Sequence, residues 1–298
     1  MKEFTLPLEP PAAGETIVFK VDWGDGDTEV ITYDSTTFSP SDLRHEYVDA
    51  GGNDLSQAEF EVKIYPLVGE KFGKYWRYLN SSSNGYADRT KLKEIKKWGC
   101  FEFAPNGYAF NGCSNLNISA TDTTYQQPVI PAGGLTYAFH GCSLLNPADF
   151  GVDAENSFNS FNTGLVTSLV STFHGCHHFN TDVGGWDTSG VTSMHSTFRG
   201  ATAFNQGSID SWDMDEVTET SYMFAGATAF NKTLNSWNMG KVVEAISMFE
   251  GAAAFNGEIN SWNMDSATTM KTMFKNAGSF NQPIGSWRTS SVTDMDEM

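Results

Sequence analysis

Residues 191–212 read VTSMHSTFRGATAFNQGSIDSW, and the chain repeats this pattern five times between residues 166 and 298. Its Phe-Asn pair recurs at steps of 25, 26, 25 and 25 residues, and a Trp follows each pair. Self-similarity at a fixed period of this length indicates a solenoid in which each repeat forms one turn. The repeat therefore predicts a solenoid for most of the chain.

Each repeat divides into two halves. Val191, Met194, Phe198 and Ala201 fall at i, i+3, i+7 and i+10, a spacing typical of one helical face. The second half, residues 204–209, is short and apolar, and it predicts one strand per repeat. A strand plus a helical or 3₁₀ turn in such a period is the leucine-rich-repeat plan. The helix N-caps expected ahead of the stripes are Ser189, Asp215, Asp265 and Ser290.

Stacking such turns predicts three ladders of identical side chains with structural roles. An inward Asn must find hydrogen-bond partners in its own or neighbouring turns, because an unpaired buried polar group costs about 1–3 kcal/mol. The ladders are Phe198, Phe224, Phe249 and Phe274; Asn180, Asn205, Asn231, Asn256 and Asn281; and Trp186, Trp212, Trp237, Trp262 and Trp287.

The stretch VTSMHSTFRGATAFNQGSIDSWD closely resembles the BspA-like leucine-rich repeats of bacterial and phage surface proteins, the domain-of-unknown-function 285 type. The resemblance covers roughly Lys91 to Met298. It implies a cell-surface, secreted or virion-associated protein with a role in adhesion. The resemblance implies no catalytic residues in this chain.

The N-terminal part has a different pattern. ETIVFKVDW, residues 15–23, alternates with Ile17, Phe19, Val21 and Trp23 on one side, which predicts a half-buried strand. VDWGDGDTEV followed by HEYVDAG and FEVKI resembles a PKD-type immunoglobulin-like domain, which implies a non-catalytic spacer or binding module. The later motif is loosened by an insertion at residues 53–57.

The expected architecture is therefore mainly β with short helices. We expect a PKD-like β-sandwich in residues 1–70, a junction and solenoid cap in 71–98, and a leucine-rich-repeat solenoid of about seven turns in 99–298. Two irregular turns carry extra length at residues 120–134 and 147–164. Insertions of this kind bulge from one face, so these loops are candidate contact surfaces, although plain tolerated loops are equally expected.

Composition excludes some partners. The formal net charge of −18 argues against nucleic acid, which requires clustered Lys and Arg, and against anionic membrane surfaces. No apolar run is long enough to span a bilayer, and no signal peptide is visible at the N-terminus. We expect an extracellular, cell-surface or virion-surface location.

Three of the four cysteines share one position of the repeat. Cys113, Cys142 and Cys176 stand where later repeats have Ala, which predicts small buried slots with free thiols. A disulfide between successive turns is the alternative.

Two groups have metal-ligand residue types. His174, Cys176, His177 and His178 lack the paired spacings of structural zinc sites. Asp22, Asp25 and Asp27 could bind calcium, but an Asp/Gly turn that binds its own backbone is favoured. We expect no cofactor other than this weak calcium candidate. No catalytic motif occurs, although two scattered carboxylates of a glycosidase are compatible with the sequence.

Two positional predictions complete the sequence reading. The step from Asn205 to Trp212 has one extra residue, so Gly207 or Ser208 should bulge outward while Ile209 stays inward beside Val183 and Leu234. The last turn lacks its core Phe, so we expect further chain or another subunit to cover that end.

The expected function is a non-enzymatic adhesion or recognition module that binds a protein or glycan. The alternatives are a structural virion protein and, third, a carbohydrate-active enzyme.

Overall fold

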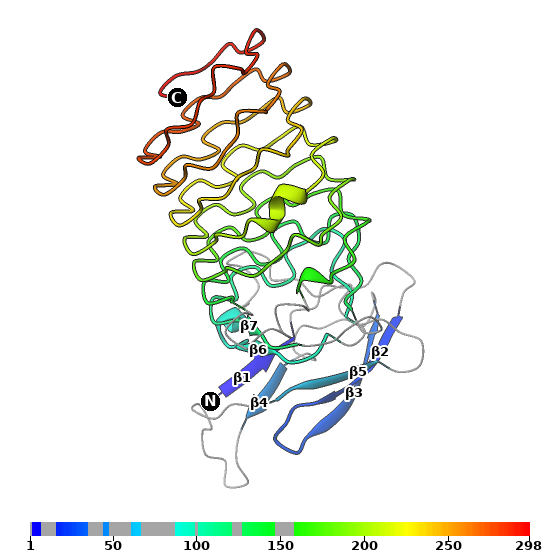
Figure 1. Ribbon diagram of the computed structural model, residues 1–298. Helices are drawn as coiled ribbons and strands as arrows, with labels where there is room; N and C mark the ends of the chain where they lie inside the picture. Colours follow the sequence, from blue (N-terminus) through cyan, green and yellow to red (C-terminus); the bar gives the residue numbers. More distant parts are fainter. Residues whose placement is uncertain are drawn as a thin grey trace.

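The protein is described by a computed structural model of residues 2–6, 16–34, 44–47, 61–66, 87–98, 101–120, 127–146 and 158–298. Short strands lie at one end, and the described residues from 87 to 298 wind into a stack of turns (Figure 1). The C-terminus lies in the turn farthest from the strands (Figure 1).

The N-terminal strands form two small antiparallel sheets. The first pairs β1 (Lys2–Thr5) with β4 (Arg44–Tyr47). The second has the order β3-β2-β5, with β2 (Thr16–Asp22) between β3 (Thr28–Asp34) and β5 (Lys63–Pro66). The full pairing of β2 with β3, from Thr16↔Asp34 to Asp22↔Thr28, follows from a short connection between them.

The predicted alternation of β2 decides which of its side chains are buried. Phe19, Val21 and Trp23 are at most 1% exposed, whereas Lys20 between them is exposed. The Trp23 indole Nε1 donates to Glu29 Oε1 at 2.8 Å, which ties the end of β2 to β3. The side chain of Ile17 and the whole of Phe60 lie outside the described residues.

The stack begins at the junction. The 3₁₀ helix η2 (Ala87–Thr90) precedes β6 (Glu94–Ile95), which pairs in parallel with β7 (Asn117–Ile118). Trp98 is buried, and its ring lies 5.5–6.1 Å from the rings of Phe101, Phe103, Phe110 and Phe161. The aromatic segment at residues 72–79 lies wholly outside the described part.

The predicted helix at residues 191–201 is wrong. Its place is taken by a parallel bridge, Ser193↔Glu219, followed by a run of tight turns. One bridge of this kind joins each pair of successive turns in the regular repeats. The bridged residues are Ser168, Ser193, Glu219, Glu244, Thr269 and Asp294.

Backbone hydrogen bonds explain why the helical spacing does not make a helix. The N–H groups of Met194, Ser196, Phe198 and Gly200 donate to carbonyls of the next turn, at 2.7–2.9 Å. The intervening N–H groups of residues 197, 199 and 201 donate to carbonyls three residues earlier, at 3.0–3.2 Å. Half of the amides therefore hold the turn together and half join it to its neighbour.

Two left-handed residues in each turn make this alternation possible. Ser196 has φ 56° and Gly200 has φ 69°, and the same two positions recur along the stack. A left-handed residue breaks an α-helix and costs about 1–2 kcal/mol for an L-amino acid, so the bonds to the next turn must offset the strain. Gly at the second position avoids that cost.

The predicted strand at residues 204–209 is also wrong. Residues 204–207 form no regular element, and η4 (Ser208–Ser211) is a 3₁₀ helix. This helix absorbs the extra residue. As a result Ile209 remains fully buried, as do Val183 and Leu234. The predicted inward position of Ile209 is confirmed.

The predicted N-caps are wrong because there is no helix to cap. At three of the four positions, the side chain two residues earlier forms an Asx turn that bonds the backbone at this corner. Asp187 Oδ1 accepts from the N–H of Ser189 at 3.0 Å, and Asp213 Oδ1 accepts from that of Asp215 at 2.8 Å. Asn263 Oδ1 does the same for Asp265, at 3.0 Å.

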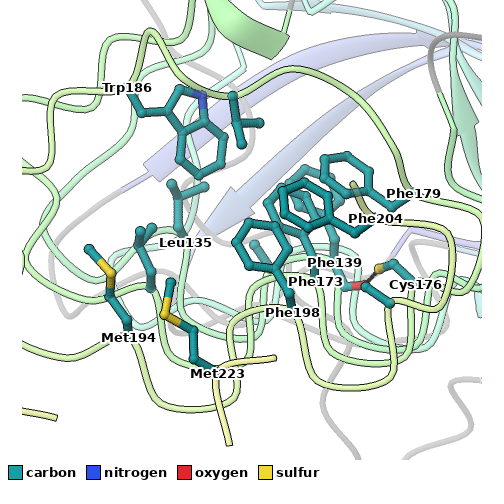
Figure 2. Packing of buried hydrophobic residues seen from close by; sticks show 14 of the residues in the cluster. Leu135, Phe139, Phe173, Cys176, Phe179, Trp186, Met194, Phe198, Phe204 and Met223 are labelled. Atoms are coloured by element: carbon teal, nitrogen blue, oxygen red, sulfur yellow. Dashed lines mark hydrogen bonds between the residues drawn. The ribbon is translucent and has the colours of Figure 1, made fainter. Parts of the chain in front are cut away.

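Phenylalanines fill the centre of the stack (Figure 2). Phe198, Phe224, Phe249 and Phe274 stack with ring centroids 5.4–5.7 Å apart and interplanar angles of at most 11°. The Phe of each Phe-Asn pair forms a second column, and within a turn the two rings approach to about 4 Å, as for Phe198 and Phe204 at 3.9 Å. Offset stacks of this kind add stabilisation beyond the area they bury.

The Asn and Trp side chains join turns through directed hydrogen bonds. The side-chain oxygens of Asn180, Asn205, Asn231 and Asn256 each accept from the N–H of the Asn one turn later, at 2.8–3.0 Å, and the series ends at Asn281. The predicted inward position of these Asn side chains is wrong, because all five are half-buried or exposed. Each Trp Nε1 donates to a carbonyl one turn earlier. The pairs are Trp186–Phe158, Trp212–Val183, Trp237–Ile209, Trp262–Leu234 and Trp287–Ile259, at 2.7–3.0 Å.

Candidate functional site

The candidate site is the outer face, defined as the side chains that point outward between the parallel bridge and the glycine of each turn. The inward positions repeat the same residue types, whereas the position before the second left-handed residue varies along the stack. It is buried where it holds Asn111 or Ala225, and it is half-buried or exposed where it holds His140, His174, Arg199, Glu250 or Lys275.

Tyrosine and histidine rings gather on the N-terminal part of the outer face. Tyr108 and Tyr137 stack with centroids 4.8 Å apart and an interplanar angle of 2°. The His140 ring makes T-shaped contacts with Tyr137, at 5.6 Å between ring centroids, and with His174, at 4.7 Å. All four side chains are half-buried, so they are held in place yet reachable from solvent.

The next turns continue the face with a charged group. The Arg199 guanidinium lies 4.7 Å from the centroid of Tyr222, a cation–π contact. His195 Nδ1 lies 3.7 Å from Glu219 Oε1, and its ring lies 5.6 Å from that of Tyr222. The outer face is therefore aromatic and basic in its N-terminal turns, and it carries both acidic and basic side chains in the later turns, such as Glu250 and Lys275.

Ionisable groups on this face influence each other. Burial lowers the pKa of His140, and burial together with neighbouring basic groups lowers the pKa of His174 to about 4. A hydrogen bond to Glu219 and its charge raise the pKa of Glu244 above the ordinary range. At neutral pH the imidazole pair is uncharged and able to donate lone pairs or hydrogen bonds.

The structure separates the residues of the predicted histidine–cysteine group. His177 and His178 are exposed, whereas Cys176 is buried and its Sγ donates to the carbonyl oxygen of Phe139 at 3.0 Å. His174 lies instead against His140, which comes from the preceding turn. Among the described residues, no three His, Cys, Asp or Glu side chains are placed to hold one metal ion.

Of the predicted calcium candidates, Asp22 is the last residue of β2, and Asp25 and Asp27 lie in the exposed turn between β2 and β3. Asp22 Oδ1 accepts from the N–H of Gly24 at 3.0 Å, and Asp25 Oδ1 accepts from that of Asp27 at 3.1 Å. Gly24 has φ 83°, and a Cβ there would meet the Glu61 carbonyl oxygen at 2.7 Å, so this turn requires glycine. Two of the three carboxylates thus bond their own turn.

The cysteines are free in the described part of the chain. Cys113, Cys142 and Cys176 are fully buried and unpaired, and burial raises the pKa of each thiol. Cys100 lies outside the described residues.

We expect these three thiols to resist modification in the native protein. A buried thiol with a raised pKa holds little of the reactive thiolate at neutral pH. Treatment with an excess of a thiol reagent, followed by peptide mass spectrometry, should label none of the three until denaturant is added. Rapid native labelling of Cys113, Cys142 or Cys176 would contradict this arrangement.

Sequence reasoning missed the outer face as a unit. It weighed His174 as a possible metal ligand and gave no role to His140 and Arg199, which are its equivalents in neighbouring repeats. The available signal was the recurring glycine at Gly141, Gly175 and the later repeats, which marks a left-handed residue in each turn.

Stacked turns with inward aromatic ladders define a repeat protein. The family model described as "Mycoplasma protein of unknown function, DUF285" matches residues 135–253 and 236–298, together more than half of the chain. The chain belongs to this family, which comprises Mycoplasma and BspA-like repeat proteins. Neither the curated proteins nor the solved structures gave a match. Within the described residues, every helix is too short or too polar to cross a membrane.

Proposed function

We propose that the chain is a non-enzymatic recognition module of a cell or virion surface, and that its outer face contacts a protein or glycan. The observation that carries this proposal is the contrast between the two sides of each turn. The buried side keeps Phe and Trp at fixed positions, while the variable position is His, Arg, Ala, Glu and Lys in successive regular turns. A regular scaffold with one variable face is typical of solenoid binding proteins.

The side chains on this face suit binding rather than packing. Tyr137, Arg199 and Tyr222 are residue types enriched at binding hot spots. Arg199 is exposed, while both tyrosines are half-buried and fixed by ring contacts. Side chains already fixed by neighbours lose less conformational freedom on binding.

The rest of the architecture is consistent with a surface role. We propose that the stack is a leucine-rich-repeat-type solenoid and that the N-terminal sheets belong to a PKD-like immunoglobulin-fold domain. The buried β2 residues and the Asp/Gly turn support this second assignment. An ion pair between Lys96 and Glu61, at 3.9 Å, links the two parts at the surface.

A binding array tests the proposal. The purified chain is screened against glycans and against cell-surface and virion proteins, and each hit is measured by titration. We expect Tyr137→Ala combined with Arg199→Ala to weaken saturable binding at least about tenfold, as loss of hot-spot residues does.

Arg288→Ala is the matched control, because Arg288 is 79% exposed but follows Trp287 at a different corner of the turn. Equal loss in this variant would refute the outer face as the contact surface. Turnover of a glycan or ester by the native chain would refute the non-enzymatic role.

A further inference from the structure

His140 and His174 occupy equivalent positions on successive turns. Each precedes a left-handed glycine, Gly141 or Gly175. The two glycine backbones pack closely, since a Cβ placed on Gly175 would lie 3.7 Å from the Gly141 Cα. The N–H of Gly141 donates to the carbonyl oxygen of His174 at 2.7 Å, and that of Phe139 donates to Thr172 at 3.1 Å. The backbones that carry the two imidazoles are therefore fixed in register on both sides of His140.

From this geometry we propose that His140 and His174 together bind one divalent first-row transition-metal ion, with water completing its coordination. Imidazole nitrogen is a preferred ligand of zinc, nickel and copper. Two imidazoles on one tetrahedral ion, at metal–nitrogen distances of about 2.0–2.1 Å, have centroids about 5 Å apart. The observed separation is 4.7 Å.

A third residue orients the first ligand. His140 Nδ1 lies 2.9 Å from Asn111 Oδ1, and Asn111 is only 4% exposed. Because an amide oxygen only accepts hydrogen bonds, His140 carries its proton on Nδ1 and keeps the Nε2 lone pair for a metal. Metal-binding histidines are oriented by this kind of hydrogen bond through their second nitrogen.

The rings cross at 89°, so binding requires one ring to turn about its Cβ–Cγ bond. That torsion is broad for His and therefore easy to change. A bound ion would join two turns that are 34 residues apart in the chain, beside the stacked Tyr108 and Tyr137. The site does not depend on the recognition function proposed above.

Calorimetric titration of the full chain without a histidine tag tests the site, with Zn²⁺ and Ni²⁺ as probes and Mg²⁺ as the negative control. We expect one Zn²⁺ and one Ni²⁺ per chain, with affinity reduced at least about tenfold in His140→Ala and in His174→Ala. Asn111→Ala should weaken binding about 10–100-fold with both histidines present.

His178→Ala is the control, because His178 is exposed but lies outside the pair. It should bind as tightly as the native chain. Circular dichroism verifies that each variant is folded, and His174→Gln replaces His174→Ala if the latter unfolds. Absence of saturable binding, or an equal loss in His178→Ala, would overturn the proposal.

Discussion

Replacing Phe224 with Ala should lower the free energy of unfolding by about 3–5 kcal/mol, the range measured for deleting a buried Phe side chain. Phe224 is fully buried, and its ring lies 5.6 Å from Phe198, 5.4 Å from Phe249 and 4.2 Å from Phe230. The aligned hydrogen bonds between turns prevent the backbone from closing the cavity. Urea denaturation, with the midpoint and slope both determined, measures the loss.

Phe280→Ala is the matched control in the same assay. Phe280 is half-buried and has rings of Phe255 and Phe274 as neighbours, at 5.7 and 4.0 Å. We expect this variant to lower the free energy of unfolding by about half as much. Part of the Phe280 side chain is already exposed to solvent, so its removal leaves a smaller cavity. Similar costs for both variants would indicate that the central ladder does not carry the stability of the stack.

The second large loss of stability is expected for the substitution Ala227→Leu. Ala227 is fully buried and occupies the slot that holds Cys113, Cys142 and Cys176 in earlier turns. Inserting three carbons into a closed slot forces neighbouring turns apart and should cost about 3 kcal/mol.

Ala227→Cys tests whether the size of the new side chain, rather than any substitution at this position, causes the loss of stability. Cys142 and Cys176 donate to the carbonyl oxygens of Phe110 and Phe139, at 3.1 and 3.0 Å. A thiol at residue 227 can reach Phe198 in the same way, so this variant should change stability by less than about 1 kcal/mol. Tolerance of Leu, measured by the same denaturation assay, would contradict a closed slot.

The sequence was sufficient to predict which side chains face inward. Val191, Met194, Phe198 and Ala201 are all fully buried, as the apolar pattern indicates. It was insufficient for the backbone, because an i, i+3, i+7 spacing is satisfied both by a helix and by a turn with two left-handed residues. The recurrent Gly200 position argues against a helix interior, where glycine costs about 1 kcal/mol relative to Ala.

The outer face could not be assembled from the sequence for a related reason. The contact between His140 and His174 depends on the register of two turns whose separation differs from the regular period. The role of Asn111 depends on a hydrogen bond to a residue one turn later. Such contacts follow from three-dimensional stacking and have no local sequence signal.

Disulfide trapping measures the turn-to-turn register of the stack directly. Ser193 and Glu219 are bridge partners on adjacent turns, so a Ser193→Cys, Glu219→Cys variant should form a disulfide under mild oxidation. Ser193→Cys with Glu244→Cys spans two turns, about 9.6 Å at the usual strand spacing, and should not. Peptide mass spectrometry identifies each bond. Efficient bonding of the adjacent pair alone supports the stacked register, whereas failure of that pair, or equal bonding of the two-turn pair, contradicts it.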